Sequence, residues 1–518
     1  MDSNKIAIIV YREDDKAFET LIEEFKHVEM PEGYECTLIE TMDETGNIGK
    51  AYNEAVASSD AKIKIFLREN TRNIDSKLLV ETVRVFNSNS EIGILGVLGY
   101  NVIFTQGQVG NKEEEPLKDS VGNPIDVLAI ENQCVMTQYD MKWREDMKSF
   151  RLSTYALCTE YRRNNYKVSV LDRSKRWLDL QPDREETTEA ELDSFLDEYS
   201  KDIYPLVSIL IPTHERPEWF TLALESALQQ TYRNIDLVVT DNSEDDRTEE
   251  IVKEYQKKYP YIRYYHIPGA SALENWQTSM DKAQSEYISY LLDDDLFLPN
   301  KVAEMMNYFF VNPSVRIVTS YRQLIDADGN VLPDAGFSRC LFEKTEFIPG
   351  EEAGKLLLTQ NFNWIGEFST AIFRQGSGKY KVHIGGWSGT EKNVIDDYGL
   401  WLQLMELGGV IYIPQPLSQF RQHSGNGTRE YRIHINGCIS MGTIIQEAWN
   451  KKKFLNNEND LKKAISAWFG MTVGILEYGY ETGYQSEEFN DLEYLFNELS
   501  SSFTKRQVDE FIILEKDN

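Results

Sequence analysis

The feature that most constrains the fold is a regular alternation of apolar runs and helical stretches between residues 207 and 318. Apolar runs begin at Val207, Ile235, Ile262 and Tyr287, and amphipathic stretches lie between them. Strands that recur about every 25–30 residues, with helices between them, form right-handed βαβ units and a mainly parallel sheet. We therefore predict an α/β fold with a Rossmann-like sheet, and a ligand site beyond the carboxyl ends of its strands.

The charge of the chain excludes several functional classes. The 518 residues include 54 Lys and Arg against 85 Asp and Glu, which gives a net charge of −31. Nonspecific nucleic-acid binding and electrostatic attachment to anionic lipid both need a cationic surface. We expect no nucleic-acid partner, and we leave peripheral membrane contact and a homo-oligomer open.

Hydropathy and cysteine spacing bear on the compartment. No apolar run reaches the roughly 20 residues of a transmembrane helix, and the run from Lys5 to Val10 predicts a first strand rather than a signal peptide. The five cysteines are scattered singly, without the spacing of a zinc site. Because such sparse cysteines are typical of a reducing compartment, we predict a cytoplasmic protein without a transmembrane segment.

The sequence outside this alternation divides into further segments. The N-terminal part predicts a second α/β unit. In the acidic stretch that follows, apolar residues between Leu192 and Tyr199 fall on one stripe of a helix, which predicts a connector helix docked on a domain. Near the C-terminus the apolar spacing is helical. The predicted domains are 1–178 (shortened α/β unit), 179–204 (acidic connector helix), 205–430 (main α/β domain) and 431–518 (small helical region).

Polar side chains follow each of the four apolar runs. In chain order they are Thr213, Glu215, Asp241, Asn275, Asp293, Asp294 and Asp295. Three adjacent carboxylates repel one another unless a cation shares their site, and hard oxygen ligands suit Mg²⁺ or Mn²⁺. We therefore predict a metal–diphosphate site at this edge of the sheet. The alternative, a solvated acidic turn such as the one at Asp326, stays open on the residues alone.

Five stretches in order resemble the glycosyltransferases of family 2. They are VSILIPTHERP (207–217), VVTDNSEDDRTEEIV (238–252), YISYLLDDDLFLP (287–299), VIDDYGLWLQL (394–404) and QFRQHSGNGT (419–428). The resemblance implies a GT-A fold for residues 205–430. It also implies inverting, metal-dependent transfer of a sugar from a nucleotide-sugar donor, with UDP expected, to a hydroxyl of a glycan, glycolipid or protein acceptor.

The resemblance also assigns roles to single residues. On the donor side it implies nucleotide-sugar binding by Thr213, Glu215, Asp241, Asn275, Asp293 and Asp294. It implies Asp295 as the main metal ligand, with Asp293 and His423 as further ligands of Mn²⁺ or Mg²⁺. It implies Asp397 as the catalytic base, and the register leaves its neighbour Asp396 as the alternative. A carboxylate suits this step because it can take the proton of the attacking hydroxyl.

Three residues are predicted on the acceptor side. Trp364 and Glu367 lie in a segment similar to the acceptor loop of the family. For Trp364, stacking on a sugar ring and packing in the core are both open, and we favour the core slightly. Trp387 stands among glycines just before the acidic pair, and we interpret this setting as a mobile acceptor or donor loop.

The N-terminal unit resembles a shortened GT-A-like domain. Arg68-Glu69-Asn70 follows its strand at the position where carboxylates are expected. We therefore predict that this unit is not catalytic, and that it binds acceptor, places a partner, dimerises or only supports the other domain. A sugar nucleotidyltransferase is disfavoured because a glycine-rich basic loop after the first strand is missing. A non-catalytic carbohydrate- or partner-binding protein is the remaining alternative.

Overall fold

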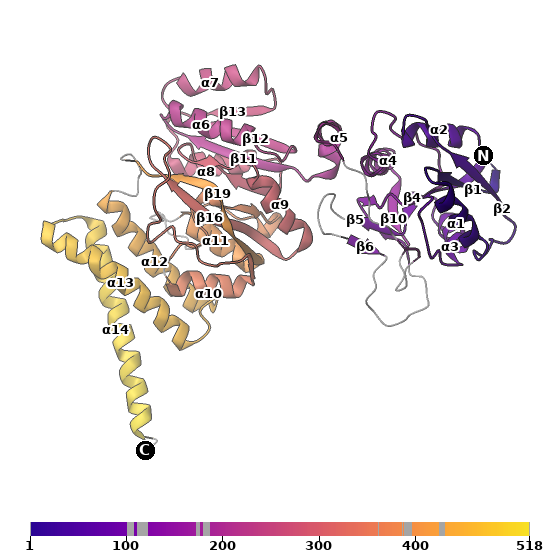
Figure 1. Ribbon diagram of the computed structural model, residues 1–518. Coiled ribbons are helices and arrows are strands. Elements are labelled where there is room, and N and C mark those ends of the chain that lie inside the picture. Colours follow the sequence, from indigo (N-terminus) through magenta and orange to yellow (C-terminus); the bar gives the residue numbers. More distant parts are fainter. Residues whose placement is uncertain are drawn as a thin grey trace. The chain divides into compact units, whose positions relative to one another are not determined.

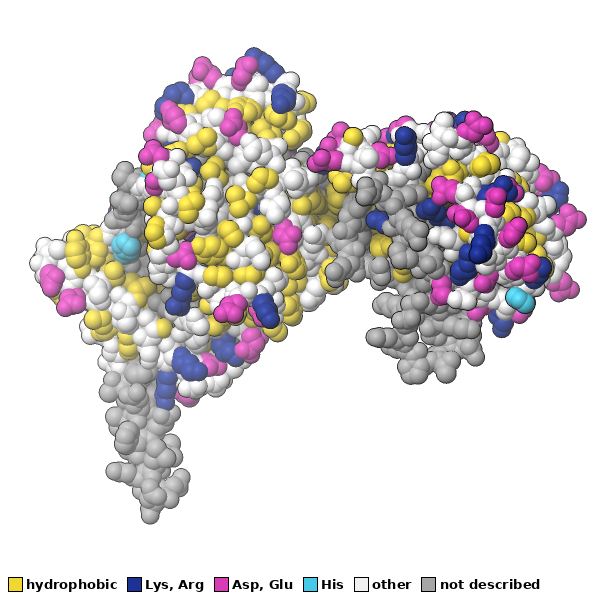
Figure 2. Space-filling view, in the orientation of Figure 1, with side chains coloured by type: hydrophobic (Ala, Val, Ile, Leu, Met, Phe, Trp, Pro, Cys, Tyr) yellow, Lys and Arg dark blue, Asp and Glu magenta, His cyan; other side chains and the backbone are white. Residues whose placement is uncertain are grey.

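The computed structural model divides the chain into two compact units, Met1–Pro205 and Leu206–Asn518, and each is described by itself (Figure 1). The structure describes residues 2–100, 108–110, 123–171, 177–179, 187–360, 362–385, 387, 396–423 and 430–516. On the face drawn in Figure 2, acidic and basic side chains are interspersed on both units. Charges of both signs are thus spread over this face.

The first unit is built on a mixed sheet in the order β2-β1-β3-β9-β4-β10-β7. Its strands are β1 (Asp2–Tyr11), β2 (Glu35–Thr41), β3 (Ala61–Arg68), β4 (Ile92–Gly96), β7 (Ile125–Asp126), β9 (Cys134–Thr137) and β10 (Lys167–Val170), and a small sheet adds β5 (Leu98–Tyr100), β6 (Gln108–Gly110) and β8 (Ala129–Ile130). The helices are α1 (Asp15–Phe25), α2 (Ile48–Ala57), α3 (Leu78–Ser88), α4 (Phe150–Arg163) and α5 (Glu189–Ile203).

Strand β1 shows why this sheet is covered on both faces. Its successive side chains alternate between two buried clusters, since neighbours in a strand point to opposite faces. Ile6, Ile8 and Val10 join the cluster with α1 and α3, and Ala7 and Ile9 join the cluster with α2, α4 and α5. A strand buried on both faces is continuously apolar, as the sequence of β1 is.

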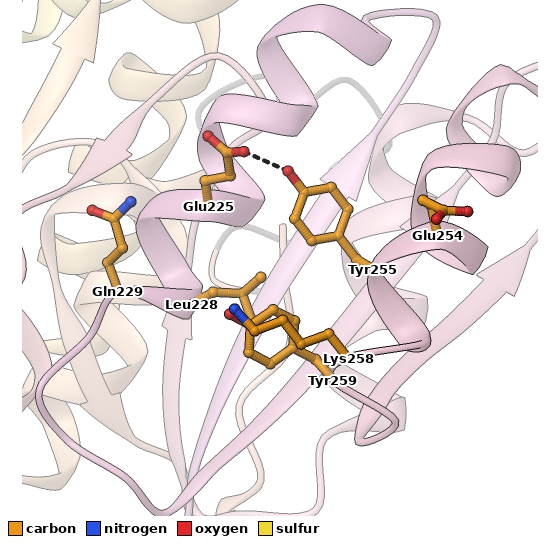
Figure 3. A pocket seen from close by; sticks show the side chains of 7 residues that line it. All are labelled: Glu225, Leu228, Gln229, Glu254, Tyr255, Lys258 and Tyr259. Carbon is orange, nitrogen blue, oxygen red and sulfur yellow. Dashed lines mark hydrogen bonds between the residues drawn. The ribbon is translucent and has the colours of Figure 1, made fainter.

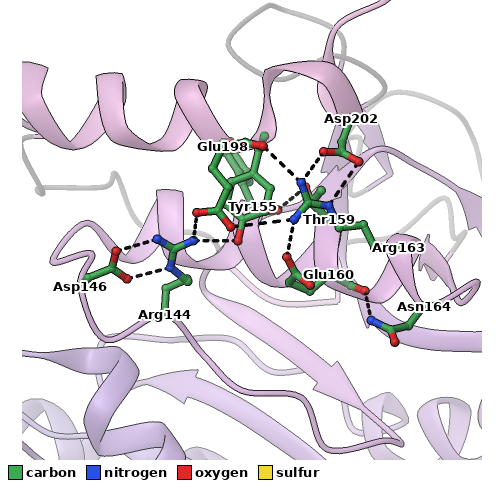
Figure 4. A network of polar contacts seen from close by, with 10 residues as sticks. Arg144, Asp146, Tyr155, Thr159, Glu160, Arg163, Asn164, Glu198 and Asp202 are labelled. Carbon is green, nitrogen blue, oxygen red and sulfur yellow. Dashed lines mark hydrogen bonds and ion pairs between the residues drawn. The ribbon is translucent and has the colours of Figure 1, made fainter.

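Helix α5, formed by the acidic stretch, docks on α4 within the first unit. Phe195 and Tyr199 are buried in the shared cluster. Figure 4 shows the polar side of this contact. Arg163 of α4 pairs with Asp202 at 2.7 Å and stands 4.7 Å from the ring centre of Tyr199, and Arg144 pairs with Glu198. Ion pairs and apolar contacts therefore hold α5 on the rest of the first unit.

The second unit has a mainly parallel sheet in the order β13-β12-β11-β14-β18-β16-β19-β15, with β17 on β19. Its strands are β11 (Val207–Thr213), β12 (Ile235–Asp241), β13 (Ile262–His266), β14 (Tyr287–Tyr290), β15 (Leu296–Phe297), β16 (Val315–Ile325), β17 (Glu346–Ile348), β18 (Ile372–Arg374) and β19 (Gly409–Arg421). The helices between them are α6 (Pro217–Leu228), α7 (Arg247–Gln256), α8 (Ala272–Lys282), α9 (Lys301–Val311), α10 (Gly350–Gln360) and α11 (Asp396–Leu407). The predicted α/β fold is confirmed.

Three long helices close the second unit: α12 (Tyr431–Lys451), α13 (Glu458–Thr482) and α14 (Glu487–Lys516). Leu461, Ala464 and Trp468 of α13 are buried in the same core cluster as α10 and α11. Asn457 caps the start of α13, and Gly483 ends it with a φ of 67°. Within the described ranges, no helix combines the length and apolarity needed to cross a bilayer.

Candidate active site

The carboxyl ends of β11, β12 and β14 meet at one edge of the second unit's sheet. Strand register pairs Thr213 with Asp241, so the segments after these strands start level with each other. A pocket of about 720 Å³ lies at this edge. The lining residues used below are Thr213, Arg216, Asn242, Asn275, Asp293 and Asp294, which we call the strand side, together with Glu367, Phe420 and Ile433 from later parts of the chain. Parallel strand ends thus deliver the polar groups to one cavity, as predicted in general terms.

One side chain ties the floor of the pocket together. Asn275 lies in the first turns of α8, which begins with a capping box between Ser271 and Glu274. Its amide Nδ2 donates to the Thr213 carbonyl oxygen at 3.1 Å and to Asn242 Oδ1 at 2.8 Å. Its Oδ1 is buried and has no hydrogen-bond partner among the residues that the structure describes. The loops after β11 and β12 are therefore fixed to α8 by one amide.

The acidic run turns sharply, and this turn separates its three side chains. The Asp295 N–H donates to the Leu292 carbonyl at 3.1 Å, which closes a turn with Asp293 and Asp294 at its corners. Asp293 and Asp294 line the pocket. Asp295 points to β19 instead, where its Oδ1 accepts the Arg421 backbone N–H at 3.1 Å. Asp294 therefore has the position facing the pocket that we had expected for Asp295.

Asp295 nevertheless keeps one oxygen unsatisfied. The residue is buried, and in the described part of the chain its Oδ2 has no hydrogen-bond partner. Burial, with the nearby charge of Asp294, holds the pKa of Asp295 well above its usual range. Burial and the charge of Asp294 also raise the pKa of Asp293 to about 6. Burial and mutual repulsion thus disfavour the ionised forms of Asp293 and Asp295.

Two basic side chains partly offset this repulsion. Arg216 Nη1 lies 3.3 Å from Asp293 Oδ1 and 2.9 Å from Asp294 Oδ2. His423 Nε2 lies 3.0 Å from the same Asp294 oxygen, and its ring packs on Trp219 with centroids 4.1 Å apart. The Arg216 guanidinium, from the loop after β11, thus stands beside two of the three carboxylates.

The residue types suit a divalent cation, but their side chains are not already arranged around a common point. Hard carboxylate oxygens from Asp293, Asp294 and Asp295 and an imidazole from His423 are ligands that Mg²⁺ or Mn²⁺ accepts. The unpartnered Asp295 Oδ2 is a buried acceptor of the kind that a cation would satisfy. Among the described residues, however, no three such groups already converge as a metal site.

Two residues predicted on the donor side do not line the pocket. Asp241 is fully buried, and its carboxylate accepts from the Ser243 N–H and the Tyr264 hydroxyl, each at 2.8 Å. Glu215 is exposed in a left-handed conformation with φ of 53°, and its N–H donates to Ser243 Oγ at 2.7 Å. Asp241 and Glu215 therefore contribute to the conformation of the loops after β11 and β12, and neither lines the pocket.

Thr213 and Asn242 contact the pocket in their place. Thr213 Oγ1 donates to Asp293 Oδ2 at 2.9 Å. Asn242, which the sequence analysis missed, follows Asp241 directly and lines the pocket. The sequence signal that could have identified Asn242 is the alternation of side chains along β12, because neighbouring residues of a strand point to opposite faces of the sheet.

The candidate base, Asp397, is not among the residues that line the pocket. Asp397 stands at the start of α11, where its Oδ2 accepts from Asn363 Nδ2 at 2.7 Å and its Oδ1 from the Tyr398 N–H at 2.8 Å. Asn363 Nδ2 also donates to the Gly366 carbonyl at 3.1 Å, and the next residue, Glu367, lines the pocket. Asp397 is therefore connected to the pocket through one asparagine. The side chain of Asp396 lies outside the described residues.

Both tryptophans of the predicted acceptor side are core residues. Trp364 is 2% exposed and packs between Phe342 and Tyr412, so the core alternative holds and no ring face is open to a sugar. Trp387 is 5% exposed, and its Nε1 donates to Glu406 at 2.9 Å. Phe454 after α12 packs on the Trp387 ring, and the rest of the predicted loop, residues 386 and 388–395, lies outside the described residues.

The equivalent edge of the first unit has the opposite charge at its strand end. Arg68 ends β3, which pairs in parallel with β1, and its Nη2 lies 3.7 Å from Glu13 in the loop after β1. The guanidinium also stands 5.8 Å from the Phe150 ring centre. Next to it, burial raises the pKa of Glu69. An arginine therefore stands at the strand end where the second unit has aspartates.

A second pocket of the second unit has a different character. It measures about 430 Å³ and lies between α6 and α7 (Figure 3). The Tyr255 hydroxyl donates to Glu225 across it, and burial and this carboxylate raise the pKa of Tyr255 to about 12. Its lining includes none of the strand-end residues. The larger pocket is therefore the candidate active site.

Comparison with known proteins agrees with the resemblance noted in the sequence. Residues 208–375 match the family described as "Glycosyl transferase family 2", and residues 7–199 match the one described as "Glycosyltransferase like family". The two matches fall on the two structural units, so the predicted recognition is confirmed.

Individual relatives are more distant. An uncharacterized glycosyltransferase of Rickettsia bellii is 27% identical over 49% of this chain, which covers only 35% of that protein's length. The GalNAc(5)-diNAcBac-PP-undecaprenol beta-1,3-glucosyltransferase of Campylobacter jejuni is 24% identical over 52% of this chain and 82% of its own. The crystal structure of S. aureus TarS 1–349 in complex with UDP-GlcNAc aligns with a TM-score of 0.35 and 10% identity, over 57% of this chain and 92% of that one.

Proposed function

We propose, from the premise that this chain belongs to glycosyltransferase family 2 and carries two GT-A-like domains, that its second unit is an inverting glycosyltransferase. It would move a sugar from a nucleotide-sugar donor to a hydroxyl of a glycan or glycoconjugate. The observation that carries the proposal is the pocket of about 720 Å³ at the strand ends, which Asp293, Asp294 and Glu367 line.

The strand side of the pocket suits the nucleotide diphosphate. Asn242 and Asn275 supply amide groups, and Thr213 fixes the Asp293 carboxylate by its hydroxyl. Arg216 adds a planar guanidinium, which binds phosphate oxygens well. UDP is the donor nucleotide that we propose, on the family resemblance of the segments after β11 and β12.

A divalent cation, Mn²⁺ or Mg²⁺, belongs to this proposal. Asp293 and Asp294 would hold it from the pocket side, with Asp295 Oδ2 and His423 as the adjoining ligands. When bound, such a cation stabilises the negative charge of the departing diphosphate. Thr213 and the His214 N–H keep the Asp293 carboxylate oriented, at 2.9 and 3.2 Å.

Asp397 is the proposed general base. Asn363 and the Tyr398 N–H hold its two oxygens, which fixes the direction of the carboxylate at the start of α11. A fixed carboxylate can take the proton of an acceptor hydroxyl as that hydroxyl attacks the anomeric carbon. One base opposite one leaving group favours a single displacement, and hence inversion.

The acceptor is proposed as a glycan hydroxyl, with a lipid-linked glycan as the first candidate. The support is the name of the Campylobacter jejuni relative, which acts on a polyprenyl-linked saccharide. For the first unit we propose a non-catalytic role, because Arg68 occupies its strand end.

The proposal is tested first by thermal unfolding with UDP, GDP, CDP and dTDP, each with and without Mn²⁺. We expect one nucleotide to raise the unfolding temperature of the second unit, and to do so mainly with metal. Release of that nucleotide from its sugar donors would then identify the sugar. If no nucleotide shifts the transition and no donor is hydrolysed, the chain is a non-catalytic binding protein.

A further inference from the structure

Arg216 occupies the point between the two pocket-facing carboxylates. A single nitrogen, Nη1, lies 3.3 Å from Asp293 Oδ1 and 2.9 Å from Asp294 Oδ2. A divalent cation that bridges the same two carboxylates needs the same space and the same oxygens. The guanidinium and the metal therefore cannot both be bound there.

Of the groups in this cluster, Arg216 is the one that can leave. Its side chain is 33% exposed, whereas those of Asp293 and Asp294 are 9% and 10% exposed. His423, which shares the Asp294 oxygen, is only 2% exposed at its side chain and is packed on Trp219. Movement of Arg216 thus requires rotation of one long, partly exposed side chain, whose guanidinium also lies 5.9 Å from the Trp219 ring centre.

We infer that Arg216 is the resident counter-cation of Asp293 and Asp294 in the donor-free protein, and that a divalent cation enters by displacing it. The inference rests on the proposed function, since it specifies how the metal of that function binds. It makes Arg216 a positioning residue with two alternative partners, the carboxylates before metal binding and the donor phosphates after it.

The backbone of Arg216 limits where the displaced side chain can go. Arg216 precedes α6 directly, and Pro217 at the first position of that helix is buried. Proline fixes the local backbone, so the guanidinium swings from a fixed anchor at the pocket wall. A diphosphate entering the pocket would bring anionic oxygens that a guanidinium binds in pairs. Metal entry thus releases the Arg216 guanidinium from the two carboxylates, and the guanidinium can then bind the donor phosphates.

The inference predicts the effect of removing Arg216 on metal binding alone. Mn²⁺ affinity is measured without nucleotide, from the electron paramagnetic resonance signal of free Mn²⁺, for wild type and Arg216→Ala. Because a competing cation is gone, we expect Arg216→Ala to bind Mn²⁺ about fivefold more tightly, the size of effect that a partly exposed ion pair supports. The thermal unfolding temperature of each variant checks that it is folded, and Arg216→Gln replaces the alanine variant if that one is not.

Arg432→Ala is the matched control. Arg432 pairs with Glu488, and its side chain is 64% exposed. Its removal lowers the net charge of the chain by the same amount, so general electrostatic attraction of Mn²⁺ rises equally. We expect its Mn²⁺ affinity to stay within twofold of wild type.

Three results would overturn the inference: unchanged or weaker Mn²⁺ binding by Arg216→Ala, equal tightening by Arg432→Ala, or no Mn²⁺ binding by any of the proteins. UDP binding in the presence of Mn²⁺ separates these failures from failure of the function. Metal-dependent UDP binding with an unchanged Arg216→Ala affinity refutes the exchange and leaves the transferase standing. UDP binding without any Mn²⁺ binding refutes both the exchange and the metal dependence.

Discussion

Replacement of Asp397 by asparagine separates the proposed base from the donor site. Asp397 does not line the pocket that contains Asp293 and Asp294, and its oxygens accept from Asn363 and Tyr398. Asp397→Asn removes a proton acceptor and leaves the groups of the strand side untouched. We therefore expect transfer to fall while nucleotide affinity stays within twofold.

The structure gives the size of both effects. A carboxylate can accept from both donors, at 2.7 and 2.8 Å, whereas asparagine has one oxygen and must leave one donor unmatched. That loss costs about 1–3 kcal/mol of stability, against a total of about 5–15 kcal/mol for a domain, so the protein stays folded. Loss of general base catalysis lowers the rate by about 10²–10⁴-fold, or about 3–5 kcal/mol. A loss of transfer of that size thus reports chemistry and not unfolding.

The assay follows nucleotide release in the presence of acceptor, with nucleotide affinity measured separately. Asp396→Asn is the matched control, one residue away on the same helix. Turnover of Asp397→Asn within tenfold of wild type, or a parallel loss of nucleotide affinity, would refute the assignment. Retained turnover with loss at Asp396→Asn would transfer the role to Asp396. Asn363→Ala, which removes the hydrogen bond to Asp397 together with those to Gly366, should lower turnover about tenfold at unchanged nucleotide affinity.

Three further predictions concern stability. Trp387→Ala should lower the free energy of unfolding of the second unit by about 3–5 kcal/mol, and Trp387→Phe should lower it by about 1 kcal/mol. Chemical denaturation measures both values, and a loss below about 1 kcal/mol for the alanine variant would contradict the packing described for Trp387. Burial holds the pKa of Lys301 well below the ordinary value of 10.5, so only the unfolded state carries that proton in the interval between the two pKa values. Relative to Lys301→Met, the free energy of unfolding of wild type should therefore rise by up to about 1.4 kcal/mol per pH unit as pH rises toward about 10, and parallel stability curves for the two proteins would refute this. Arg163→Ala should speed hydrogen exchange of the α5 amides about two- to fivefold, and unchanged exchange would mean that the ion pair with Asp202 contributes nothing to docking.

The parts of the site that the sequence predicted depend on strand order alone. Thr213, Asn275, Asp293 and Asp294 lie at one pocket because parallel strands end at one edge, and this follows from the βαβ pattern. Two errors came from finer geometry. Asp241 and Asn242 exchange places because side chains alternate, and Asp295 leaves the pocket because the chain turns at Asp293 and Asp294.

The contacts that the sequence did not predict join residues far apart along the chain. Arg216 meets the acidic run 77 residues away, and no local pattern marks that pairing. Trp387 is buried because Phe454 covers it, so its environment is decided by helices that come later in the sequence. Ile433 of α12 lines the pocket for the same reason. The surroundings of Arg216, Trp387 and Ile433 are therefore determined by tertiary packing and not by the glycines or charged residues next to them in the sequence.

The amide of Asn275 has a consequence for how donor preference can be altered. Because it holds the loops after β11 and β12 to α8, a substitution in one of these loops is transmitted to the others. This wall cannot be redesigned one loop at a time. Glu367, Phe420 and Ile433 also line the pocket, come from three separate segments of the chain and are not joined by that amide. Under the proposed function, changes of donor preference should therefore begin at these three residues.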